Sequence, residues 1–237
     1  MPVTNKVYQP ETKWWDTDRL VPNKDSVINM LFTAQPKPSF TPGSSFEYSN
    51  TAYALLAMII ERISNQSFTT FMEQNIFKPL EMNNTQVLAY VPNDTLSIKN
   101  RAYGYWAKNK RVIYPAEHHY LNCMQGEGGV FSNAPDLVKW DAALYTEKLV
   151  SKETINEAFT GYIDWHKSKN LKYGYGWGII EENGETRYTE HSGGWVGFRT
   201  FIHRDIKNQN CIILLCNNSM KKGIESSLKK FKQLLED

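Results

Sequence analysis

Apolar side chains recur at helical spacing through much of the first 160 residues. Such spacing is typical of helices that bury one face. It predicts helices over residues 24–34, 51–63, 68–76, 132–145 and 151–160, and a closing amphipathic helix over 223–235. The helix over 51–63 is apolar almost all round, so we expect it to be buried. Either Ser49 or Asn50 would cap its first turn.

Beyond Lys172 the pattern changes to short stretches rich in β-branched and aromatic residues, which favour strands. These stretches are YGYGWGII, TRYTEHS, FRTFIHR and CIILLCN, separated by the turn-like ENGE, GGWVG and IKNQN. Short connections favour antiparallel pairing. Helices followed by strands and a closing helix indicate an α+β fold. We expect one domain over 1–237, mostly helical and loop over 1–160, with the strands and closing helix over 161–237.

Composition narrows the class of protein. The chain has 237 residues, of which 41% are hydrophobic, and a formal net charge of +2. Most of its lysines are spread out, so charge gives no reason to expect a nucleic-acid partner. No apolar run approaches the roughly 18 residues that a membrane span needs, and the first residues lack the apolar stretch of a signal peptide. Cys211 and Cys216, five positions apart on a predicted strand, point to opposite faces and are poor disulfide partners.

Four stretches carry the candidate chemistry. Tyr48-Ser49-Asn50 directly precedes the apolar helix, and the phrase F-x-PL-x-M-x-x-T follows at residues 77–85. GEGGVFSNAPDLVKW then leads into a helix, and HSGGWVGFRTFIHRD leads into the last strand. By itself the first tripeptide is a polar turn that caps a helix. Similarly, Gly193-Gly194 by itself reads as a turn that ends a strand.

Taken in this order, the four stretches resemble the serine β-lactamase-related hydrolases, from about residue 20 to the C-terminus. That family includes class C β-lactamases, D-alanyl-D-alanine carboxypeptidases and related esterases. The resemblance implies a β-lactamase/transpeptidase-like fold, with an antiparallel sheet flanked by helices. It also implies cleavage of a small-molecule or peptide amide or ester through an acyl-enzyme, without a cofactor or metal.

The resemblance assigns roles to single residues. Tyr48 would shuttle the proton between nucleophile, lysine and leaving group, which a phenol does at neutral pH only if nearby cations lower its pKa. Asn50 would orient the lysine and the substrate amide. His191-Ser192-Gly193 replaces the family's Lys-Thr-Gly and would bind substrate.

The backbone N–H of Gly194 would form half of the oxyanion hole. A histidine at position 191 titrates near neutrality and is not a permanent cation. It should hold a substrate carboxylate less firmly, which favours an esterase or a D-Ala peptidase over a dedicated β-lactamase.

The family nucleophile, in Ser-x-x-Lys, is missing upstream of Tyr48. None of the serines there has a lysine three residues on; they are Ser26, Ser39, Ser44 and Ser45. The matches Ser219/Lys222, Ser226/Lys229 and Ser227/Lys230 lie after the last strand, where we interpret them as the solvated face of the closing helix.

We therefore expect an N-terminally incomplete hydrolase that is inactive alone. Two alternatives stay open: a non-catalytic homologue that binds a peptide or peptidoglycan-like ligand, and one half of a split enzyme that joins a separate N-terminal chain. The parent enzyme would reside in the periplasm or cell envelope, as members of this family usually do.

Overall fold

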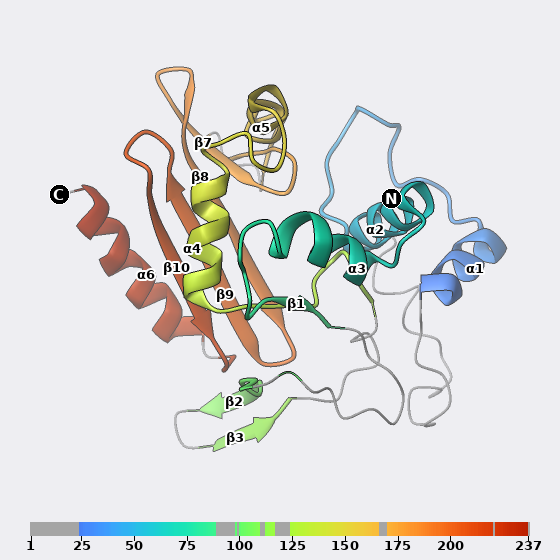
Figure 1. The fold of residues 1–237 in the computed structure, drawn as a ribbon, viewed down its shortest axis with the longest axis horizontal. Coiled ribbons are helices and arrows are strands. Elements are labelled where there is room, and N and C mark those ends of the chain that lie inside the picture. The colour runs from blue at the N-terminus through green and yellow to red at the C-terminus, as the bar shows by residue number, and fades with distance from the viewer. Residues whose placement is uncertain are drawn as a thin grey trace. The chain divides into compact units, whose positions relative to one another are not determined.

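The computed structural model describes residues 24–88, 98, 100–109, 112–116, 124–165, 170–219 and 221–236 (Figure 1). The chain divides into two compact units. A helical unit contains residues 1–79, 84–99 and 118–131, and a sheet unit contains residues 80–83, 100–117 and 132–237. The expectation of one domain divided near residue 160 stays a prediction.

The helical unit begins with the two helices that the apolar pattern predicts. They are α1 (Lys24–Ala34) and α2 (Asn50–Ser64). The hydroxyl of Ser49 caps α2 by accepting a hydrogen bond of 3.2 Å from the backbone N–H of Ala52. The third predicted helix is α3 (Phe68–Met72), which continues as the π-helical turn η2 (Glu73–Phe77). Strands β1 (Gln86–Val87) and β4 (Val130–Phe131) pair antiparallel in the same unit.

The expectation that α2 is buried all round is wrong. One face is buried, where Ala54 and Met124 form a small core against which Met30 and Leu31 of α1 pack. Apolar side chains on the remaining surface of α2 are exposed, by 51% at Leu56, 50% at Ile59 and 79% at Ile63. The apolar surface of α2 is therefore larger than the area that the other described residues cover.

The sheet unit is built on a six-stranded antiparallel sheet in the order β10-β9-β8-β7-β6-β5. The strands are β5 (Ile163–Asp164), β6 (Lys172–Tyr173), β7 (Gly178–Glu182), β8 (Glu185–Trp195), β9 (Phe198–Asp205) and β10 (Asn210–Cys216). A separate hairpin joins β2 (Tyr105–Asn109) to β3 (Val112–Pro115). The helices are α4 (Ala134–Ala143), α5 (Lys152–Ala158) and α6 (Lys221–Glu236). These elements agree with the predicted α+β order.

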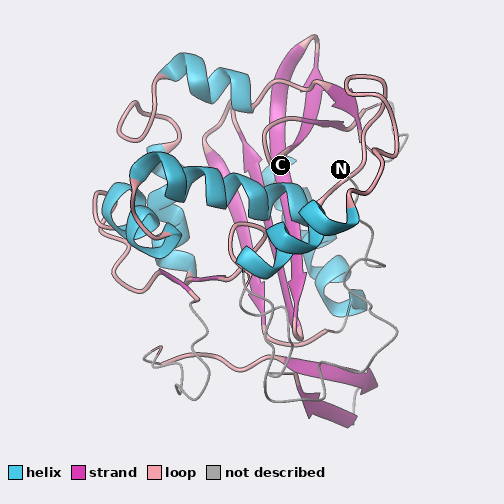
Figure 2. Ribbon diagram, turned by 90° about the vertical axis from the view of Figure 1, so that its right-hand side faces the viewer, coloured by secondary structure: helices cyan, strands magenta, loops and turns pink. Residues whose placement is uncertain are grey.

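Helices α4 and α6 cover opposite faces of this sheet (Figures 1 and 2). Neighbouring residues of a strand point to opposite faces. On β9, His203 bonds Glu190, which also binds Lys232 of α6, at 2.8 and 2.6 Å. The next residue, Arg204, is fully buried and bonds Asp141 of α4. The α4 face holds the main core of the unit, with Phe159, Trp177 and Ile179 at its centre.

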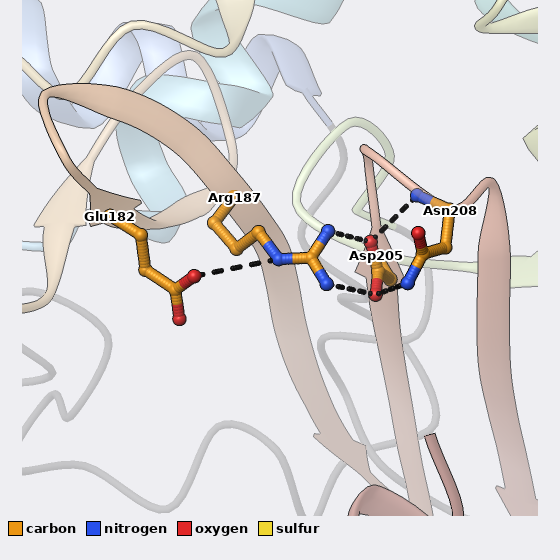
Figure 3. Close-up of polar contacts among 4 residues, drawn as sticks. All are labelled: Glu182, Arg187, Asp205 and Asn208. Atoms are coloured by element: carbon orange, nitrogen blue, oxygen red, sulfur yellow. Dashed lines mark hydrogen bonds and ion pairs between the residues drawn. The ribbon is translucent and has the colours of Figure 1, made fainter. Parts of the chain in front are cut away.

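A buried carboxylate fixes the turn between β9 and β10 (Figure 3). Asp205 is fully buried and accepts both arms of the Arg187 guanidinium from β8, one of them at 2.7 Å. It also accepts bonds of 2.9 and 3.1 Å from the backbone and side chain of Asn208 in the turn. Glu182 approaches the other side of Arg187 at 3.5 Å. The ends of three strands are therefore tied to one charge cluster.

Two further observations bear on the sequence predictions. Cys211 and Cys216 are free thiols on β10, and both are half-buried. Within the described residues, no helix combines the length and apolar character needed to cross a membrane.

Candidate active site

The start of α2 positions two of the predicted site residues. Tyr48 immediately precedes the cap residue Ser49, and Asn50 is the first residue of the helix. The polar-turn interpretation accounts for Ser49, whose hydroxyl makes the cap. It does not account for Tyr48 and Asn50, whose side chains are exposed on either side of that cap.

The environment of Tyr48 keeps its phenol protonated at neutral pH. Partial burial raises the pKa of Tyr48 above its usual value, and the nearby Tyr53 and Glu127 raise it further. Each of these effects disfavours the phenolate. The sequence argument required cations that lower this pKa, whereas the described surroundings of Tyr48 raise it.

Glu127 is a residue that the sequence motifs missed. Burial raises the pKa of its carboxyl to about 7, so that it is partly ionised at neutral pH. It belongs to the loop of residues 124–129, which leads directly into β4. The one clue to Glu127 in the sequence is that a charged residue interrupts the glycine-rich run GEGG.

His191 lies near the end of β8 as a neutral hydrogen-bonding group. Burial lowers the pKa of His191, and the hydrogen bond to the Ser192 carbonyl opposes that effect in part. The Ser192 carbonyl can only accept, so Nδ1 of His191 donates across 2.8 Å. In the neutral ring Nε2 is then an acceptor, and the hydroxyl of Tyr173 donates to it across 3.3 Å. The imidazole therefore differs from a lysine in charge as well as in shape.

Two aromatic side chains hold the His191 ring. Trp165 stacks on it with ring centroids 5.7 Å apart, and Tyr173 meets it edge-on at 6.1 Å. The indole of Trp165 fits because residue 178 is glycine, where a Cβ would lie 2.6 Å from a ring carbon. Sequence analysis assigned neither aromatic residue to the site, because both come from segments distant from the motif.

Ser192, Gly193 and Gly194 continue β8 and pair with β9, at positions Phe201, Thr200 and Arg199. The alternative that Gly193-Gly194 is a turn is therefore wrong. Pairing of β8 with β7 stops at Glu190, so this part of β8 has a strand neighbour on one side only among the described residues. A Cβ at Gly193 would lie 2.3 Å from the Thr200 hydroxyl, and one at Gly194 would lie 2.5 Å from the Arg199 guanidinium.

A two-residue turn fixes the end of the β8–β9 hairpin. Val196 and Gly197 both have positive φ, of 34° and 86°, as a type I′ hairpin turn requires. Positive φ is unfavourable for a β-branched residue such as Val196. Close packing supports this conformation, because the Val196 carbonyl lies against Gly104 and the backbone of Tyr105 lies against Gly197.

The predicted site residues thus form two groups, one in each unit. Tyr48 and Asn50 stand at the start of α2, and His191 to Gly194 stand at the end of β8. That the two groups face a common substrate stays a prediction. The adjacent His118 and His119, whose sequence favours a polar loop pair over a metal site, fall outside the described residues, as does His166.

Comparison with known proteins identifies the group to which this chain is related. A family model described as "Beta-lactamase" matches residues 8–230. The chain belongs to the beta-lactamase family.

Its relatives include several kinds of hydrolase-like protein. Penicillin-binding protein 4* of Bacillus subtilis is 33% identical over 227 residues, which cover 91% of this chain and 49% of that protein. A D-aminopeptidase of Brucella anthropi is 25% identical over 162 residues, covering 68% of this chain and 29% of the relative. The chain therefore spans about half the length of its Bacillus subtilis relative.

Solved structures agree on the fold. The D-amino acid amidase of Ochrobactrum anthropi matches with a TM-score of 0.74 at 20% identity, over 92% of this chain and 64% of that chain. An octameric penicillin-binding protein homologue of Pyrococcus abyssi matches with a TM-score of 0.72 at 27% identity, over 91% and 47% of the two chains. This member of the beta-lactamase-related serine hydrolases thus has the fold that its sequence motifs predict.

The serines of the three Ser-x-x-Lys matches near the C-terminus do not have the surroundings of a nucleophile. The Ser219 hydroxyl accepts a hydrogen bond of 2.8 Å from the backbone N–H of Ala107 and so ties the last strand region to β2. Ser226 and Ser227 are exposed on α6. Ser226 and Ser227 thus agree with the interpretation of that helix face as solvated, whereas for Ser219 it is wrong, because Ser219 precedes α6 and is half-buried.

Proposed function

We propose that this chain supplies the acid–base and oxyanion side of a serine hydrolase that cleaves an amide or ester through an acyl-enzyme. Tyr48 transfers the proton, Asn50 orients the substrate amide, and the backbone N–H of Gly194 stabilises the oxyanion. His191, Ser192 and Gly193 form the strand edge along which the substrate lies. The chain as given is inactive alone, because no serine upstream of Tyr48 is followed by lysine at the third position.

One observation carries the choice of substrate class. His191, in the place of the family lysine, is a neutral ring whose Nε2 accepts a hydrogen bond from Tyr173. A neutral acceptor gives a substrate carboxylate no ion pair. It suits an uncharged amide or ester, or the amine end of a D-amino acid derivative. The likeness to a D-aminopeptidase and to a D-amino acid amidase supports the same class.

The exposed apolar face of α2 favours a second candidate, half of a split enzyme. Leu56, Ile59 and Ile63 present apolar surface that a soluble helix normally buries. A separate chain with the Ser-x-x-Lys helix would cover such a face and complete the site. In that case the activity depends on both chains, whereas a single longer chain needs no partner.

One set of assays tests these proposals. The chain as given, incubated with p-nitrophenyl acetate and with a fluorescent penicillin, should give neither turnover nor a labelled adduct. A longer protein with the Ser-x-x-Lys segment encoded upstream, or the chain mixed with a separately encoded segment, should hydrolyse the ester. The Tyr48→Phe variant of that complete protein should lose roughly 10²–10⁴-fold in rate, as expected for a lost acid–base group.

The controls separate the candidates. Tyr145→Phe, in the sheet unit, removes a phenol that no site argument uses and should keep the rate. A serine adduct on the chain as given would overturn the claim of inactivity. A complete protein that binds D-amino acid amides without ever cleaving them would support the non-catalytic alternative.

A further inference from the structure

One edge of β8 presents backbone groups of Ser192 and Gly194. Trp195 and Phe198 flank the two-residue turn of the hairpin, so their backbones bond each other across it. Successive residues of an antiparallel strand point their N–H and C=O groups to opposite sides. The odd-numbered residues back to Arg187, whose carbonyl accepts a 3.0 Å bond from the residue after β9, therefore face β9. Ser192 and Gly194 face the other side, past the end of the pairing with β7.

The side chain of His191 caps one of these edge groups. Its Nδ1 donates across 2.8 Å to the Ser192 carbonyl. In a neutral ring this bond requires the tautomer with the proton on Nδ1, and the hydrogen bond of the other nitrogen sets that tautomer. Here Nε2 accepts from the Tyr173 hydroxyl at 3.3 Å. Tyr173 is itself fixed, because it is buried in β6 and pairs with Ile163 on one side and Gly178 on the other.

Trp165 keeps the imidazole in the orientation that both hydrogen bonds need. Its indole stacks on the His191 ring with 22° between the two planes, and its other neighbour, Tyr173, meets it edge-on at 4.9 Å. Three rings from β5, β6 and β8 thus pack against one another. The arrangement leaves both nitrogens of His191 engaged with groups of the protein itself.

We propose that Tyr173 is a positioning residue that fixes the His191 tautomer and so closes the Ser192 carbonyl to substrate. This inference rests on the proposed role of Gly194 and adds the size of the leaving group. A substrate that uses both the N–H and the C=O of Gly194 pairs antiparallel with β8, because only antiparallel pairs exchange two bonds between the same two residues. The reacting residue then lies opposite Gly194, and the second residue of the leaving group lies opposite Ser192.

The closed carbonyl limits how far a substrate extends along the edge. Ser192 offers the second leaving residue its N–H but not its carbonyl, which His191 occupies. Main-chain hydrogen bonds supply the affinity when a peptide adds to a sheet edge. The site therefore favours a small leaving group, such as ammonia, an alcohol or a single amino acid, over a longer peptide. Tyr173 acts on this choice through His191.

The first measurement reads the tautomer in the chain as given. Long-range ¹H–¹⁵N spectra of the ¹⁵N-histidine-labelled protein, recorded above neutral pH, distinguish a protonated ring nitrogen from a bare one. The His191 signals, assigned by their loss in His191→Gln, should show the proton on Nδ1. Tyr173→Phe keeps a ring against Trp165, but a second tautomer with the proton on Nε2 should appear. The matched control Tyr175→Phe changes an exposed tyrosine that stacks on Tyr162, and should leave the spectrum unchanged.

The second measurement reads selectivity in the complete protein with its Ser-x-x-Lys segment. Two probes share one D-residue, which is followed by a leaving group of one amino acid in the first and two in the second. Tyr173→Phe should raise kcat/KM for the longer probe relative to the shorter by about 2- to 10-fold, the usual worth of one hydrogen bond. Tyr175→Phe should keep the ratio. Without turnover, the ratio of the two Kd values, read from the Gly194 amide signal, replaces it.

A proton on Nε2 of His191 in the unmodified chain, or a tautomer that Tyr173→Phe leaves unaltered, overturns the positioning role. An unaltered selectivity ratio in Tyr173→Phe overturns the closure of Ser192. If Tyr173→Phe does not fold, the position of the His191 proton in the unmodified chain decides. An inactive complete protein with the expected tautomer and ratio refutes the proposed function alone, whereas an active protein with the other tautomer refutes this inference alone.

Discussion

Replacing Asp205 by asparagine tests whether the charge cluster of Figure 3 holds the sheet unit together. The substitution keeps the shape of the side chain but removes its charge. One of its oxygens becomes an amide group that faces the guanidinium of Arg187 donor to donor. Breaking a buried ion pair by removing one partner typically costs about 3–5 kcal/mol.

The structure places this variant at the lower end of that range. Asp205 is fully buried, but its partner Arg187 is 17% exposed and retains a second carboxylate, Glu182, at 3.5 Å. Water and Glu182 therefore compensate part of the lost charge. The backbone N–H of Asn208 can still donate to the remaining oxygen. We expect a loss of about 3 kcal/mol in the free energy of unfolding.

Urea unfolding followed by tryptophan fluorescence measures this loss, because Trp140 and Trp177 stack in the core of the same unit. The control Glu182→Gln removes the exposed partner and should change stability by about 0–1 kcal/mol. A loss below about 1 kcal/mol for Asp205→Asn would refute the reasoning, since the carboxylate would then behave like a surface charge. Equal losses in the two variants would refute it as well.

Two further predictions concern the His191 environment. Because burial lowers the pKa of His191, the unfolded chain binds this proton more readily than the folded one. The contribution of His191 to stability is complete above its unfolded pKa of about 6.5 and declines as the pH falls below it. Urea midpoints across that range should show the decline, and His191→Gln should flatten it. Gly178→Ala should push the Trp165 ring from His191 and lower stability by about 1–3 kcal/mol. Proton NMR can follow the titration of the His191 imidazole in the Gly178→Ala variant. An unchanged titration would contradict the stacking of Trp165 on His191.

Sequence alone predicted the elements and the family. Helical spacing predicted α1, α2 and α4 closely, because apolar residues recur in each at intervals of three and four positions. Alternating strands with short connections predicted the antiparallel order of β7 to β10. The motif residues were found because they lie within a few positions of one another, at Tyr48 to Asn50 and at His191 to Gly194.

Tertiary structure decided the rest. The sequence predicted α2 as buried, but burial depends on which segments pack against it, and these cover only one of its faces. Gly193 and Gly194 resembled a turn, yet pairing with β9 extends the strand through them. Trp165 and Tyr173 reach His191 only because the strands bring separate segments together, and Gly126, the neighbour of Glu127, meets α2 at Tyr53 and Ala57 only in the folded unit. Local spacing fixes helices, strands and motifs, whereas the protonation state of a side chain depends on burial and on charges from distant segments.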